Sequence, residues 1–135
     1  MKVSVNEYKQ SLLYPNIVKA VSECLMESNA VEPIQVFVKL GYLKNEDLQH
    51  WKNGQIQVLE NVISCNLNKA GIILRILRYH AHDLNLSPSV VIYKKKGEML
   101  RFSKSGEKNI EKAYSTNLLR LKKVKSKITN QQPKK

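Results

Sequence analysis

The chain has 135 residues, the length of one ordinary domain, and 42% of them are hydrophobic, enough for one modest core. It carries 23 Lys and Arg against 11 Asp and Glu. This surplus is uneven, because residues 1–90 hold nine basic and eight acidic side chains whereas residues 91–135 hold fourteen and three. A near-neutral body with a cationic C-terminal third predicts a polyanionic partner. The sequence has neither an apolar run of about 18 residues nor the apolar core of a signal peptide, so we expect no membrane span and a cytoplasmic location.

The cysteines and histidines do not form a metal-binding pattern. Cys24 and Cys65 stand 41 positions apart in apolar segments, and without a signal peptide they are expected to be reduced, buried thiols. A zinc site needs about four closely spaced ligands, and the chain has no CxxC pair to begin one. We therefore expect no metal and no cofactor.

The N-terminal half predicts short helices. Residues 1–14 are expected to form an arm or a short helix, followed by a single domain over residues 15–121. Within that domain, helices are predicted over residues 15–28, 34–40 and 46–52, with Gly41 as the left-handed C-cap of the second. Trp51, on the third helix, is expected to pack in the core.

The middle of the chain predicts two further helices joined by a turn. Residues 55–65 show one apolar face, residues 66–68 favour a turn or kink, and residues 67–84 have the clearest helical period of the chain. The apolar side chains of this last helix recur every three or four residues and define a predicted seam: Leu67, Ala70, Leu74, Leu77, Ala81 and Leu84.

After Pro88 the pattern changes from helix to strand. Residues 90–93 and 100–103 are predicted to pair as a β-hairpin with a basic tip. A final helix is expected to follow Ser105-Gly106-Glu107 and to end near Leu121, and residues 122–135 are expected to be a basic, disordered tail. The fold class is therefore α+β: a mostly helical single domain with one β-hairpin, with an element order compatible with a winged helix.

One face of the predicted helix 67–84 carries cationic side chains beside the apolar seam. At about 100° per residue, Gly71, Arg75, Arg78 and His82 fall together, and we call these four residues the arginine stripe. Such a face suits a phosphate backbone or a DNA groove, although most faces of this kind are solvated helix surfaces. The preceding helix, the turn and this helix would form a helix-turn-helix, and the hairpin would be the basic wing.

Two other segments have interpretations that involve chemistry. His80-Ala81-His82-Asp83 has the residue types of a hydrolase metal site, but residues two apart on a helix point about 200° apart, so a continuous helix would separate the histidines. Residues 101–106 contain two hydroxyls, Lys104 and a glycine before a helix, which could hold a phosphate. The alternative for this segment is an ordinary strand, turn and N-cap.

Parts of the sequence between residues 36 and 116 resemble a family of small bacterial proteins. The matching segments are Val36–Tyr42, Trp51-x-x-Gly54, Leu59-Glu60, Asn66-Leu67, Ile73–Arg78, His80-Ala81-x-Asp83-Leu84, Pro88-Ser89 and Leu100–Gly106. No activity is assigned to that family. The resemblance implies a discrete bacterial-type domain and nothing about mechanism.

These observations favour a non-enzymatic nucleic-acid-binding protein, with DNA preferred over RNA. One alternative is an interaction module that docks on a larger protein through an exposed apolar patch around residues 36, 37, 42 and 51. The other is a small nuclease or toxin-like enzyme that uses His80, His82, Asp83, Arg101 and Lys104. The expected nucleic-acid contacts are Arg75, Arg78, His82, Lys94, Lys95, Lys96, Arg101, Lys104, Lys122, Lys123 and Lys125.

Overall fold

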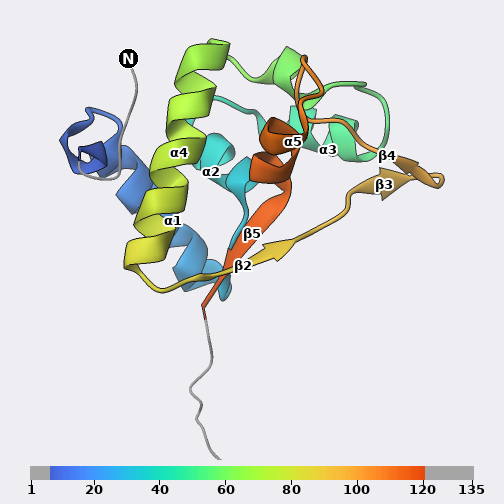
Figure 1. The fold of residues 1–135 in the computed structure, drawn as a ribbon. Coiled ribbons are helices and arrows are strands. Elements are labelled where there is room, and N and C mark those ends of the chain that lie inside the picture. Colours follow the sequence, from blue (N-terminus) through green and yellow to red (C-terminus); the bar gives the residue numbers. More distant parts are fainter. Residues whose placement is uncertain (1–6, 121–135) are drawn as a thin grey trace, which may run out of the picture.

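The computed structural model describes residues 7–120 and has an α+β fold, as predicted, with five α-helices and a small sheet (Figure 1). The helices are η1 (Tyr8–Gln10, a 3-10 helix), α1 (Tyr14–Glu27), α2 (Pro33–Leu40), α3 (Asn45–Lys52), η2 (Leu59–Val62, 3-10), α4 (Leu67–Asp83) and α5 (Lys108–Ser115). The strands are β1 (Ala30–Val31), β2 (Ser87–Val90), β3 (Lys94–Lys95), β4 (Glu98–Met99) and β5 (Thr116–Leu119).

The main sheet has the strand order β1-β5-β2, so its central strand comes last in the chain. β5 pairs antiparallel with both neighbours, with Leu118 opposite Val31 on one side and opposite Pro88 on the other. In Figure 1 the sheet lies in the lower half of the molecule, beside α1 and the lower end of α4, and the β3–β4 hairpin projects at the right. This central strand ties together two parts of the chain that are distant in sequence.

Local sequence signals account for several helix ends. Pro33 occupies the first turn of α2, where its missing N–H costs nothing. Gly41 ends this helix with φ +88°, in the left-handed conformation that the sequence predicts. Asn66, expected to mark a turn, caps α4 by accepting a hydrogen bond of 2.8 Å from the Lys69 backbone N–H.

The core is organised around an aromatic cluster. The Phe102 ring stacks on Tyr114, with centroids 5.4 Å apart, and packs against Trp51 at 4.9 Å. Trp51 is fully buried, as predicted, and its indole N–H donates a 2.8 Å hydrogen bond to the Arg101 carbonyl. The expected apolar surface patch was wrong, because Val36, Phe37 and Trp51 are all fully buried in this core.

The predicted helix over residues 55–65 was also wrong, and with it the predicted helix-turn-helix. This stretch contains only the single 3-10 turn η2, because its backbone bonds to another segment of the chain. The N–H groups of Leu59 and Glu60 donate to the carbonyls of Arg101 and Phe102, at 3.1 and 2.9 Å. No second helix therefore precedes α4 in the way that a helix-turn-helix requires.

The predicted hairpin and last helix are correct in kind but not in extent. Val90 ends a strand that pairs with β5 rather than with residues 100–103, which leaves the hairpin reduced to β3 and β4. A hydrogen bond of 2.8 Å from the Leu100 N–H to the Tyr93 carbonyl extends it slightly. The last helix ends at Ser115, because the next four residues become the central strand of the sheet.

The N-terminal segment packs on the rest of the domain. Of the two alternatives for residues 1–14, the described part contains the short helix, η1. Tyr8 on this helix is 3% exposed, and its hydroxyl donates to the Asp83 carboxylate at the end of α4. Burial and the bond to Asp83 raise the pKa of Tyr8 far above its ordinary value.

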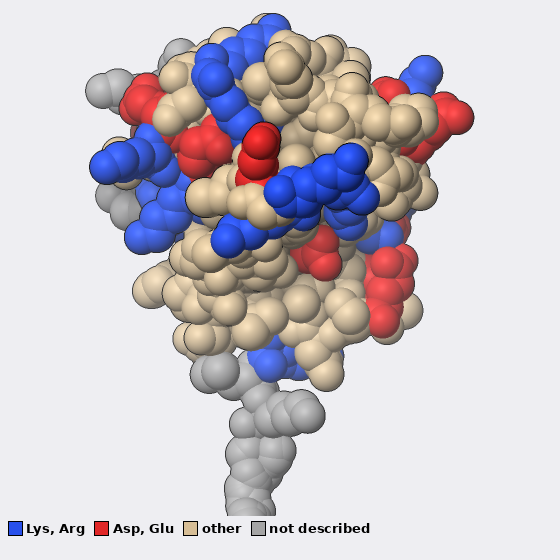
Figure 2. Space-filling model, turned by 90° about the vertical axis from the view of Figure 1, so that its right-hand side faces the viewer, with Lys and Arg blue, Asp and Glu red and all other residues tan. Residues whose placement is uncertain are grey.

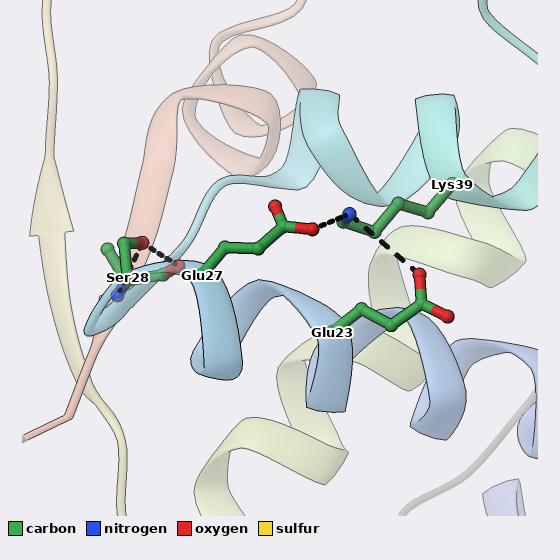
Figure 3. A network of polar contacts seen from close by, with 5 residues as sticks. Glu23, Glu27, Ser28 and Lys39 are labelled. Carbon is green, nitrogen blue, oxygen red and sulfur yellow. Dashed lines mark hydrogen bonds and ion pairs between the residues drawn. The ribbon is translucent and has the colours of Figure 1, made fainter.

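A polar cluster joins α1 to α2 (Figure 3). Lys39 lies between two carboxylates of α1, 2.8 Å from Glu27 and 3.8 Å from Glu23. The hydrogen bond to Glu27 is the main cause of the raised pKa of Lys39. Because the Lys39 side chain is only 17% exposed, this cation serves the helix interface and not the surface charge of the protein.

Candidate functional site

A groove of about 940 Å³ lies between α4 and α5 and is bounded at one end by the main sheet. The two helices contact each other. Buried aliphatic side chains form the floor of the groove, among them Leu77, Ala81 and Leu118. Leu74 of α4 and Ile110 of α5 line it as half-buried side chains. The groove is thus an aliphatic surface that the core of the domain does not fully cover.

The structure brings the whole arginine stripe to this groove. Gly71, Arg75, Arg78 and His82 all line it and are all exposed. Among the described residues, no carboxylate forms an ion pair with Arg75 or Arg78. The Arg78 guanidinium lies 5.3 Å from the centroid of the Tyr79 ring, within the range of a cation–π contact. A Cβ at Gly71 would meet no atom within 4 Å, so the groove is open at that point.

The hairpin lysines form a separate cationic group. Lys94, Lys95 and Lys96 are exposed, and none of them lines the groove. Figure 2 faces the side of the molecule that carries the hairpin and shows basic side chains across it, with acidic side chains between them. In the hairpin register, Glu98 stands opposite Lys95. In a winged helix, the recognition helix and the wing contact the same DNA duplex. The separation of the hairpin lysines from the arginine stripe does not support that arrangement.

Arg101 has a structural partner and does not line the groove. Its guanidinium donates to the backbone carbonyls of Ser103, at 2.8 Å, and Lys104. It also covers Gly106, where a Cβ would lie 3.2 Å from the guanidinium. Arg101 therefore stabilises the loop between β4 and α5 through hydrogen bonds within that loop.

The backbone N–H groups of the loop over residues 101–106 do bind anions, as its sequence indicates. These anions are two carboxylates of the protein itself and not a bound phosphate. The Glu111 carboxylate accepts from the N–H groups of Phe102, at 3.0 Å, and Ser103, at 2.6 Å, and from the Ser103 hydroxyl. The Glu60 carboxylate accepts from the Lys104 N–H and the Tyr114 hydroxyl, both at 2.7 Å. These two carboxylates already occupy the donors that a phosphate would need.

The structure does not bring His80 and His82 together. α4 continues to Asp83, so His80 is buried and lies edge-on to the Tyr14 ring, 5.7 Å between centroids, while His82 is exposed in the groove. Burial is the main cause of the lowered pKa of His80. Asp83 bonds to Tyr8 and lies 3.7 Å from Lys9. Within residues 7–120, no three His, Cys, Asp or Glu side chains are grouped so that they could hold a metal ion.

The cysteines are unpaired. Cys24 is buried and Cys65 half-buried, with no disulfide between them. Burial raises the pKa of the Cys24 thiol to about 11, which keeps it protonated and unreactive at neutral pH. In the part of the chain that the structure describes, no helix is long and apolar enough to cross a bilayer.

The remaining predicted contacts lie in the tail. Lys122, Lys123 and Lys125 fall outside the described residues. Sequence reasoning missed the α5 wall of the groove, formed by Ile110, Lys112 and Ala113. The apolar period of this helix was visible in the sequence, but nothing there indicated that α5 lies beside α4.

The comparisons with known proteins do not identify a relative. No family model, no curated protein and no solved structure matches the chain. The resemblance over residues 36–116 therefore gains no support from them and carries no argument about function.

Proposed function

We propose that this protein binds nucleic acid without catalysing a reaction, through a cationic surface that contacts the phosphate backbone. One observation carries the proposal: the excess of positive charge is not neutralised within the described fold. Residues 7–120 contain sixteen Lys and Arg and eleven Asp and Glu. Within this range, only Lys9 and Lys39 form ion pairs.

The reason for the unbalanced surface is that several carboxylates have other roles. Glu60 and Glu111 accept hydrogen bonds from the backbone of the loop after β4. Glu23 and Glu27 are directed at Lys39 between two helices. The cations left without acidic partners raise the local concentration of a polyanion and release its counterions on binding.

The proposal assigns phosphate contacts to Lys94, Lys95 and Lys96 on the hairpin, to Lys104, and to the tail lysines 122, 123 and 125. Arg75, Arg78 and His82, which the sequence also predicts as nucleic-acid contacts, line the groove between α4 and α5, where none of the hairpin lysines lies, and the proposal does not depend on them. Because no helix-turn-helix presents α4, binding is expected to be governed by charge rather than by base sequence. DNA is preferred over RNA in this proposal, and a cytoplasmic location is supported by the two unpaired cysteines.

Binding of a fluorescein-labelled 20-base-pair DNA duplex to the full chain, followed by anisotropy from low to physiological salt, tests this proposal. The logarithm of affinity should fall linearly with the logarithm of salt concentration, by about 0.9 per phosphate contact. Replacing the three hairpin lysines with Gln should reduce this slope by about 2–3 and weaken all sequences alike. Lys44→Gln, an exposed cation at the start of α3, serves as the control.

The result that would contradict the proposal is an absence of binding at low salt. A second informative comparison uses a chain truncated after Leu121. If truncation abolishes binding entirely, the tail alone is responsible and the hairpin contacts are wrong. Equal or stronger binding to an RNA duplex of the same sequence would overturn the preference for DNA.

A further inference from the structure

We propose that the groove between α4 and α5 is a docking site for an acidic amphipathic helix of a partner protein. This inference concerns a surface that nucleic-acid binding by the hairpin and tail leaves unused. It rests on three properties of the groove: the chemistry of its floor, the charge of its rim and its length.

The floor is suited to aliphatic side chains. Leu74, Leu77 and Ala81 contribute from α4, and Ile110 and Leu118 contribute from α5 and β5. Among residues 7–120, no Phe, Tyr or Trp lines the groove. Proteins that hold single-stranded nucleic acid in a groove stack bases on aromatic rings, so this floor favours leucine-like anchors over bases.

The rim is mainly cationic. Arg75, Arg78 and His82 stand along the α4 side, and Lys112 stands on the α5 side together with one exposed acid, Glu107. The second acid of the lining, Glu60, is buried and already accepts two hydrogen bonds. Because the rim is mainly cationic, a complementary partner helix would carry carboxylates on either side of its apolar face.

The length of the groove argues for a helix rather than a small molecule. The α4 residues that line it run from Leu67 to His82. At 1.5 Å per residue this is roughly 22 Å, or about four helical turns. A partner helix of about 16 residues would place apolar side chains at i, i+4, i+7 and i+11 along the floor.

A second copy of this chain is a poor occupant. Its formal net charge is +12, so two copies approaching through a cationic rim repel each other. Duplex DNA meets the rim charge but offers nothing to the aliphatic floor. An acidic amphipathic helix satisfies both surfaces.

The test is a titration of the ¹⁵N-labelled full chain with a designed 16-residue helical peptide that has Leu at the four anchor positions and Glu beside them. We expect chemical-shift changes confined to α4, α5 and β5. Two control peptides carry Lys in place of Glu, or Ala in place of Leu, and both should bind at least tenfold more weakly. Equal binding of the Lys peptide, shifts on other surfaces, or no binding at millimolar peptide would overturn the proposal.

Protein variants locate the site without disturbing the core. The pair Arg75→Glu and Arg78→Glu should weaken the acidic peptide about tenfold or more, since it replaces two attractions with repulsions. Gly71→Leu should weaken it as well by filling the open end of the groove, where a Cβ meets nothing within 4 Å. Lys44→Glu makes a charge reversal outside the groove and should leave affinity unchanged.

Measuring both peptide and DNA binding with the same protein variants distinguishes this inference from the proposed nucleic-acid binding. The hairpin Lys→Gln triple variant should lose DNA affinity while keeping peptide affinity. If DNA displaces the peptide and produces the same shifts on α4 and α5, the groove belongs to nucleic acid and the docking proposal is wrong. Dimerisation through the groove in sedimentation equilibrium would likewise overturn it in favour of a second copy.

Discussion

Replacing Glu111 with Gln tests whether the loop after β4 is held by an internal anion. The Glu111 carboxylate accepts three hydrogen bonds, from the Phe102 N–H to one oxygen and from the Ser103 N–H and hydroxyl to the other. Gln keeps the shape of the side chain but has only one acceptor oxygen. Whichever way the amide is turned, its NH₂ group faces a backbone N–H.

The expected cost follows from the burial of that N–H group. Ser103 is 1% exposed, so water does not replace the lost acceptor. A buried donor left without a partner costs about 1–3 kcal/mol, and the loss of a charged acceptor places this case in the middle of the range or above. We therefore expect Glu111→Gln to lower the free energy of unfolding by about 2 kcal/mol.

Urea denaturation followed by circular dichroism measures this change. With a slope of about 1–3 kcal/mol per molar urea for a domain of this size, the midpoint should fall by roughly 1 M. The matched control is Glu98→Gln, the same chemical change at an exposed hairpin position, which should stay within about 0.5 kcal/mol of the unsubstituted protein. Equal stability of the two variants would refute the role given to the Glu111 carboxylate.

Three further predictions concern α4. Gly71→Ala should raise the free energy of unfolding by about 0.5–1 kcal/mol, because the helix gains a better helix former at a position with free space, and thermal melting checks this. Asn66→Ala should lower it by about 1 kcal/mol through loss of the cap to Lys69, whereas the neighbouring exposed Asn68→Ala should change it little in urea denaturation. Burial lowers the pKa of His80 below 6.5, so the folded state favours the neutral imidazole, and stability should fall as the pH drops below 6.5. Unfolding midpoints between pH 7.5 and 5 should show this fall, and His80→Leu should reduce it.

The helices with local start and stop signals could be predicted from the sequence, and the sheet could not. α2 is defined by Pro33 and Gly41, which act within one turn of the chain. β5 is defined by β1 and β2, which lie more than 25 residues away, and residues 116–119 continue the apolar spacing of α5 closely enough to be predicted as helix. Tertiary pairing overrides local propensity in such cases.

The helix predicted before α4 is wrong for the same reason. Residues 55–65 have a helical apolar period, yet the N–H groups of Leu59 and Glu60 bond to the carbonyls of residues 101 and 102. The anion-holding character of the loop 101–106 was recognisable from its composition. That Glu60 and Glu111 fill it could not be, because both acids reach the loop only after the chain has folded.

The predicted apolar seam of α4 is correct at Ala70, Leu77 and Ala81, and its three other members, which are not buried, support the docking surface. The deeply buried face of the helix is formed by Ala70, Ile73, Ile76, Leu77, His80 and Ala81. Leu67 and Leu84, at the two ends of the predicted seam, are 52% and 44% exposed. The helix thus carries more apolar surface than its own domain covers, and part of the excess, at Leu67 and Leu74, lines the groove beside the arginine stripe. An aliphatic surface of this kind costs free energy in water unless something binds it. The cations along its rim have no acidic partner within the described fold. A partner that supplies both leucine-like side chains and carboxylates would therefore complement the floor and the rim together.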